Sequence, residues 1–81
     1  MGQEERQGSG AAFPQETMRQ RWLNAKLVEH GYTLGWRQFL IEQKASGRSN
    51  FALSVRLTTE YGASVEGSTL GKWHRQAVQE T

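Results

Sequence analysis

The stretch that decides the fold is Leu53-Ser54-Val55-Arg56-Leu57-Thr58-Thr59-Glu60-Tyr61-Gly62-Ala63-Ser64-Val65-Glu66-Gly67-Ser68-Thr69-Leu70-Gly71-Lys72-Trp73-His74-Arg75-Gln76. Apolar residues recur at helical spacing on both sides of Gly62, and glycine ends a helix at low cost because it has no side chain. The pattern predicts two short helices joined by a tight turn that begins at Gly62. Helix pairs of this kind form helix-turn-helix motifs, so double-stranded DNA is the first partner to consider.

The last of these helices, predicted from about Gly67 to Val78, has two different sides at about 100° per residue. One side holds the apolar residues Leu70, Trp73 and Ala77. The opposite side holds the polar and basic residues Ser68, Lys72, Arg75 and Gln79. A helix that enters the major groove needs one side to pack on its own domain and another to meet phosphates and base edges. We therefore expect the polar side to contact DNA, and the alternative is an ordinary solvated helix face.

Individual residues of this helix have different candidate roles. Lys72 and Arg75 lie three residues apart, where a phosphate or a guanine could be contacted. Ser68 and Thr69 lie in the first turn, where hydroxyls and free backbone N–H groups can bind a phosphate oxygen. Thr69 could instead only support the turn.

Gly71 is unusual, because glycine inside a helix costs about 1 kcal/mol relative to alanine. It would let the helix backbone approach DNA closely, or it would relieve crowding against a neighbouring helix, and the sequence leaves both readings open. Arg48 and Ser49 precede the helix that contains residue 53, so they are secondary candidates for phosphate contacts.

The segment resembles the helix-turn-helix of homeodomain-like proteins found in phage small terminase subunits, transposases and related mobile-element regulators. The resemblance rests on Tyr61-Gly62, Val65, Ser68-Thr69-Leu70 and Lys72-Trp73. It implies a DNA-binding protein that inserts its last helix in the major groove, either as a small transcription regulator or as the DNA-recognition part of a phage or mobile-element assembly. Such a short surface implies a homo-oligomer. Two features depart from the family: Glu66 stands where a capping Ser or Thr is usual, and Ala63 and Ser64 lengthen the turn.

The rest of the chain predicts one all-α domain, a small bundle of about four helices, over residues 15–81. Residues 1–14 are polar, rich in glycine and end on the only proline, so we expect a disordered tail. Residues 15–30 form the first helix, whose apolar residues lie on two sides; we expect an oligomerisation element added to a compact unit of the other three helices. One side holds Met18, Trp22 and Ala25, and the other holds Leu23 and Leu27.

The second helix should be capped by Thr33 and end before Gly47, and Ser49 or Asn50 should cap the third. The second helix places Trp36, Phe39, Leu40 and Gln43 on one face. The third is apolar on most of its circumference, with Phe51, Leu53, Val55, Leu57 and Tyr61. We expect Trp22, Trp36 and Trp73 to pack in the core rather than stack on bases.

Composition excludes several other functions. The 81 residues leave room for one domain, and without cysteine there is no disulfide framework or thiolate zinc site. We expect no metal, no cofactor and no enzyme, because the chain lacks Asp and any phosphate-cradling loop. No run of 18 apolar residues and no secretory signal is present, so a cytoplasmic protein that avoids membranes is expected.

A helical protein–protein interaction module is the alternative function. The net charge is only +2, and Glu66 and Gly71 are not typical of a DNA-contacting segment. In that case a partner protein replaces DNA, and the basic pair is incidental.

Overall fold

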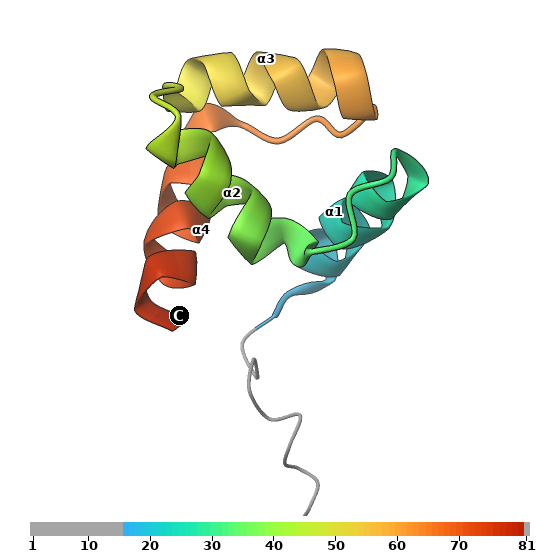
Figure 1. Cartoon of the computed structure of the whole chain (residues 1–81), viewed down its shortest axis with the longest axis horizontal. Helices are drawn as coiled ribbons and strands as arrows, with labels where there is room; N and C mark the ends of the chain where they lie inside the picture. The colour runs from blue at the N-terminus through green and yellow to red at the C-terminus, as the bar shows by residue number, and fades with distance from the viewer. Residues whose placement is uncertain (1–15, 81) are drawn as a thin grey trace, which may run out of the picture.

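The computed structural model describes residues 16–80, which form four helices and no strand. The helices are α1 (Met18–Glu29), α2 (Gly35–Ala45), α3 (Asn50–Tyr61) and α4 (Gly67–Glu80). In Figure 1, α3 lies across the top, α2 and α4 descend together from one of its ends, and α1 lies on the other side of α2. The predicted all-α class is confirmed. The tail predicted over residues 1–14 lies outside the described residues.

All four helices contribute to one core. Its buried apolar residues are Leu23, Leu27, Trp36, Phe39, Leu40, Leu53, Leu57, Ala63, Val65, Leu70, Trp73 and Ala77. Leu23 and Leu27 of α1 are fully buried, and burying a leucine side chain contributes about 2 kcal/mol. The prediction that helix one is an addition to a three-helix unit is therefore wrong, because α1 supplies part of the core itself.

Helix α1 begins three residues after the predicted start at residue 15 and ends one residue before the predicted end at residue 30. The Thr17 hydroxyl accepts a hydrogen bond from the backbone N–H of Gln20, and the Gln20 side chain accepts one from the backbone N–H of Thr17. This reciprocal pair is a capping box, which satisfies two N–H groups that have no partner inside the helix. Gly31, with φ of 89°, follows the last turn in the left-handed region.

Helix α2 does not begin as predicted. Leu34, not Thr33, is its N-cap residue, and no side chain from its own segment caps it. Instead, the Asn24 side-chain oxygen of α1 accepts a 2.7 Å hydrogen bond from the backbone N–H of Trp36. An N–H group at a helix start needs an acceptor from any source, and here a neighbouring helix supplies it.

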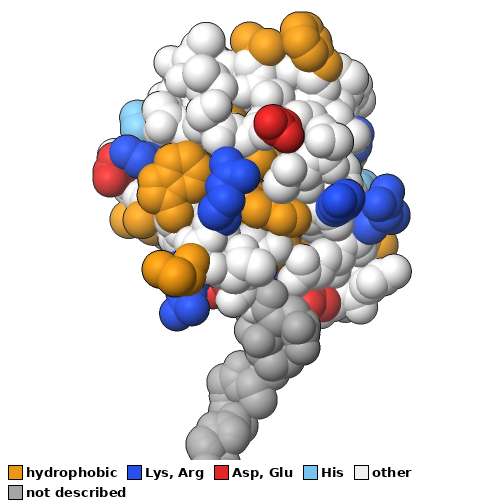
Figure 2. All heavy atoms as spheres, turned by 180° about the vertical axis from the view of Figure 1, so that it is seen from behind, with side chains coloured by type: hydrophobic (Ala, Val, Ile, Leu, Met, Phe, Trp, Pro, Cys, Tyr) orange, Lys and Arg blue, Asp and Glu red, His pale blue; other side chains and the backbone are white. Residues whose placement is uncertain are grey.

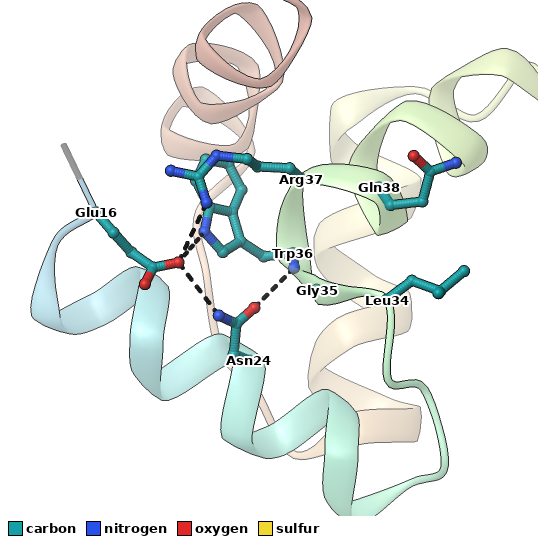
Figure 3. A pocket seen from close by; sticks show the side chains of 7 residues that line it. All are labelled: Glu16, Asn24, Leu34, Gly35, Trp36, Arg37 and Gln38. Carbon is teal, nitrogen blue, oxygen red and sulfur yellow. Dashed lines mark hydrogen bonds and ion pairs between the residues drawn. The ribbon is translucent and has the colours of Figure 1, made fainter. Parts of the chain in front are cut away.

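A buried ion-pair cluster fastens α2 to both ends of the described chain. Arg37 of α2 is 8% exposed, and its guanidinium pairs with Glu80 at 2.7 Å and with Glu16 at 3.2 Å. The same Glu16 carboxylate oxygen accepts hydrogen bonds from the Trp36 indole and from Asn24, as Figure 3 shows. The start of α1, the start of α2 and the end of α4 are thus joined by charge-assisted hydrogen bonds.

The connection between α3 and α4 is not the predicted tight turn. Gly62 has φ of 64° and ends α3 as expected, but residues 62–66, hereafter the linker, then run back along α3 (Figure 1). The Ser54 hydroxyl, in the middle of α3, donates a 2.6 Å hydrogen bond to the Val65 carbonyl. Because Ala63 and Val65 are buried, the linker adds to the core and delivers α4 to the N-terminal end of α3.

Not every apolar residue of α1 and α3 is in the core. Leu53 and Leu57 of α3 are fully buried, whereas Phe51 is 77% exposed and Val55 is 45% exposed. A helix with apolar residues around most of its circumference can bury only one side in a bundle of this size. Trp22 is 37% exposed, so the prediction that all three tryptophans pack in the core is wrong for Trp22.

Candidate nucleic-acid interface

Helix α4 has the two-sided arrangement that its sequence pattern predicts. Leu70, Trp73 and Ala77 are buried against the rest of the domain. Trp73 also packs against the Trp36 ring, with the ring centroids 5.7 Å apart. The opposite side, hereafter the outward face, is exposed and consists of Ser68, Lys72, Arg75 and Gln79.

The two cations of the outward face carry charge that no other described residue neutralises. Within residues 16–80, neither Lys72 nor Arg75 takes part in an ion pair or a side-chain hydrogen bond. Arg37, by contrast, is nearly buried between two carboxylates. Lys72 and Arg75 therefore leave their hydrogen-bond donors open to an external anion, with phosphate oxygen as a matching acceptor.

The first turn of α4 adds polar groups beside these cations. Ser68 is exposed and Thr69 is half-buried. The backbone N–H of Leu70 makes the bond to the Glu66 carbonyl that opens the helix, so the N–H groups of residues 67–69 precede the repeating helical bonds. These groups and the Ser68 hydroxyl lie at the positive end of the helix dipole.

Gly71 is positioned by packing within the protein. A Cβ atom added at Gly71 would lie 2.9 Å from the side-chain nitrogen of Asn50 on α3. The other end of that amide, its oxygen, accepts a 2.8 Å hydrogen bond from Lys44. One turn earlier, a Cβ at Gly67 would lie 3.5 Å from the Asn50 backbone. Of the two roles considered for Gly71, the structure supports relief of crowding between α3 and α4.

Arg48 and Ser49 directly precede Asn50, which lies next to Gly67 and Gly71 at the start of α4. Both are exposed. The Ser49 hydroxyl accepts a hydrogen bond from the backbone N–H of Ala52, so it acts as the N-cap of α3. The structure thus brings the beginnings of α3 and α4 together, although the two segments are separated in the sequence.

Arg19 of α1, to which no sequence pattern points, contacts the segment that leads into α4. Its guanidinium donates a 2.9 Å hydrogen bond to the Ser64 carbonyl in the linker. Figure 2, which views the molecule from behind Figure 1, shows a basic side chain near the middle of that face, next to hydrophobic ones, and further basic side chains towards its right-hand edge. Arg19 lies in the sequence about fifty residues before α4, so only the fold could associate it with that helix.

A hollow of about 320 Å³ lies between α1 and α2 and is lined by Glu16, Asn24, Leu34, Gly35, Trp36, Arg37 and Gln38. Figure 3 shows that the Glu16 carboxylate, the Asn24 amide, the Trp36 indole and the Arg37 guanidinium point at one another, whereas the Gln38 side chain points away from them. Among residues 16–80, no group of three or more His or Glu side chains could hold a metal ion. The polar groups of the hollow serve to join the helices.

Comparisons with known proteins add no identification. No protein-family model, curated protein or solved structure matches the chain. In the part of the chain that the structure describes, no helix combines the length and apolar character needed to cross a bilayer.

Proposed function

We propose that the protein binds double-stranded DNA through the outward face of α4, which would lie in the major groove. The observation that carries this proposal is the pair Lys72 and Arg75, exposed and without an ion-pair partner among residues 16–80, on the side of α4 opposite to its buried residues. A groove contact needs this combination of a fixed helix and free donors. Arg48, Ser68 and Gln79 would extend the contact along the phosphate backbone and the base edges.

The contact surface is short, so the proposal includes more than one copy of the chain on the DNA, as in a small regulator or the DNA-recognition part of a phage or mobile-element assembly. Helix α1 remains the candidate for self-association. Its Leu23 and Leu27 side is used by the core, which leaves the opposite edge, with Met18 at 81% exposed and Ala25 also exposed.

Duplex binding at several salt concentrations tests the proposal. If Lys72, Arg75 and one or two further cations each neutralise a phosphate, log K should fall against log salt with a slope of about −3. The variant Lys72→Ala/Arg75→Ala should lower the slope to about −1 and weaken binding about sixtyfold at 0.1 M salt, because each contact contributes about 0.9 to that slope. Unchanged helicity would show that the variant is folded.

A control variant distinguishes DNA binding through the outward face of α4 from nonspecific attraction of DNA to positive charge. Arg21→Ala/Arg56→Ala removes the same charge from two other helices. Helicity is measured for this variant too, because the half-buried Arg56 pairs with the exposed Glu60 and donates a hydrogen bond to Gln43. This control variant should retain most of the affinity. Equal losses of duplex affinity in the two double variants would mean that the outward face of α4 is not the DNA-binding surface.

The exposed apolar pair on α3 favours a second candidate, a protein-interaction module. Phe51 and Val55 lie one helical turn apart and are 77% and 45% exposed, and such adjacent apolar residues are typical of a surface that binds another helix. In that case Phe51→Ser should abolish binding of the partner protein. The Lys72→Ala/Arg75→Ala variant should then have no effect on it.

A further inference from the structure

Arg19 is held against the segment that leads into α4. One terminal nitrogen of its guanidinium bonds to the Ser64 carbonyl at 2.9 Å, three residues before α4 begins. The next residue, Gln20, donates a 3.0 Å hydrogen bond to the side chain of Gln76 on α4 itself. Arg19 therefore contacts the linker, and its neighbour Gln20 contacts α4, which places Arg19 beside the segment that leads into α4.

The positive charge of Arg19 remains available to bind an external anion. Arg19 is exposed, and among residues 16–80 it pairs with no carboxylate. Besides its bond to Ser64, its guanidinium lies 6.0 Å from the centre of the half-exposed Trp22 ring, at the outer limit of a cation–π contact. A guanidinium has five N–H donors in a planar fork. Among residues 16–80 only the Ser64 carbonyl accepts a hydrogen bond from this guanidinium, so donors remain for an external anion.

The Ser64 carbonyl and the Trp22 ring restrict how the Arg19 guanidinium can move. The carbonyl of Ser64 fixes one edge, and the Trp22 ring lies on one side. An arginine that is already ordered loses less conformational entropy when it binds an anion. Glu66, exposed in the same linker, opposes anion binding nearby, but it forms no ion pair with Arg19.

From these observations we propose that Arg19 is a further DNA contact, which binds a backbone phosphate beside the groove that α4 enters. The inference rests on the proposed function, because it assigns Arg19 to the same duplex as Lys72 and Arg75. The duplex would then be held from two helices, α4 in the groove and α1 on its flank. This arrangement fixes the orientation of α4 more firmly than contacts from α4 alone.

The test measures duplex affinity by fluorescence anisotropy for the full chain, Arg19→Ala and Arg21→Ala over a range of salt. Arg21 is the matched control, since it is an exposed cation on the same helix, about 200° around the axis from Arg19. Arg19→Ala should bind about eightfold more weakly at 0.1 M salt and lower the salt slope by about 0.9, the value of one phosphate contact. Arg21→Ala should stay close to the parent in both quantities.

Two further variants distinguish the loss of the Arg19 charge from other effects of the substitution. Arg19→Lys retains the charge and should preserve the salt slope, whereas Arg19→Gln should behave as Arg19→Ala does, with helicity measured in each case. If the parent binds the duplex but Arg19→Ala and Arg21→Ala bind equally well, the contact at Arg19 is refuted and the role of α4 is untouched. If the parent itself does not bind the duplex, the proposed function fails and this inference fails with it.

Discussion

The contact between Gly71 and Asn50 gives a sharp prediction about stability. In Gly71→Ala, the new Cβ would lie 2.9 Å from the Asn50 side-chain nitrogen, so the amide must rotate away and lose its hydrogen bond from Lys44. Alanine favours the helix over glycine by about 1 kcal/mol, and the lost hydrogen bond costs about 1 kcal/mol. We expect the two effects to cancel and the free energy of unfolding to change little.

The Asn50→Ala variant allows the stabilising effect of alanine at position 71 to be measured without the obstructing amide. In Asn50→Ala the obstructing amide is gone, so adding Gly71→Ala should raise the free energy of unfolding by about 1 kcal/mol, the full helix propensity. The coupling energy between the two positions is then about 1 kcal/mol, which is typical of residues in contact.

Urea unfolding followed by tryptophan fluorescence and far-UV circular dichroism measures all four proteins of the cycle. Trp36 and Trp73 are buried and report the loss of the core. Equal stabilisation of the parent and of the Asn50→Ala background by Gly71→Ala would refute the contact, because alanine at 71 would then meet no obstacle from α3.

Three other predictions concern the ion-pair cluster and the linker. Arg37→Met should lower the free energy of unfolding, measured in urea, by about 2–3 kcal/mol, because two largely buried carboxylates lose their partner. An unchanged urea concentration at the unfolding midpoint would show that the ion-pair cluster does not contribute to stability. The hydrogen bond from Arg37 lowers the pKa of Glu80 from its ordinary value of 4.5, so this stabilisation is present above that pH and is lost as the pH falls through the lowered value. The midpoint temperature of thermal unfolding should therefore fall more steeply with decreasing pH for the parent than for Glu80→Gln. Parallel curves of midpoint temperature against pH would contradict the pairing of Arg37 with Glu80. Glu66→Gln should strengthen duplex binding severalfold, most at low salt where screening is weakest, whereas unchanged affinity would place the linker away from the phosphates.

Local features of this chain could be predicted because local physics decides them. The 3.6-residue period separates Leu70, Trp73 and Ala77 from the polar side of α4, and the structure buries these three residues. Gly62 ends α3 in the left-handed region, as its lack of a side chain suggests.

Features that depend on contacts between distant segments could not be predicted in this way. Asn24 caps α2 from another helix, and Arg37 joins carboxylates at 16 and 80. No spacing along the sequence indicates these contacts. The linker looked like a turn because glycine begins it, yet the burial of Ala63 and Val65 makes it run back along α3.

The same distinction applies to the candidate interface. The outward face of α4 follows from the sequence period alone, as does its pair of cations. Arg19 and the role of Gly71 depend on which helices pack side by side, because each is defined by an atom far away in the sequence: the Ser64 carbonyl for Arg19 and the Asn50 amide for Gly71.

Mapping of backbone amide chemical shifts by NMR, during titration with a duplex, tests the central claim most directly. We expect the largest changes on the outward face of α4, at Ser68, Lys72, Arg75 and Gln79, and we expect them to diminish at high salt. Changes centred on Phe51 and Val55, or no changes at a low salt concentration, would contradict it.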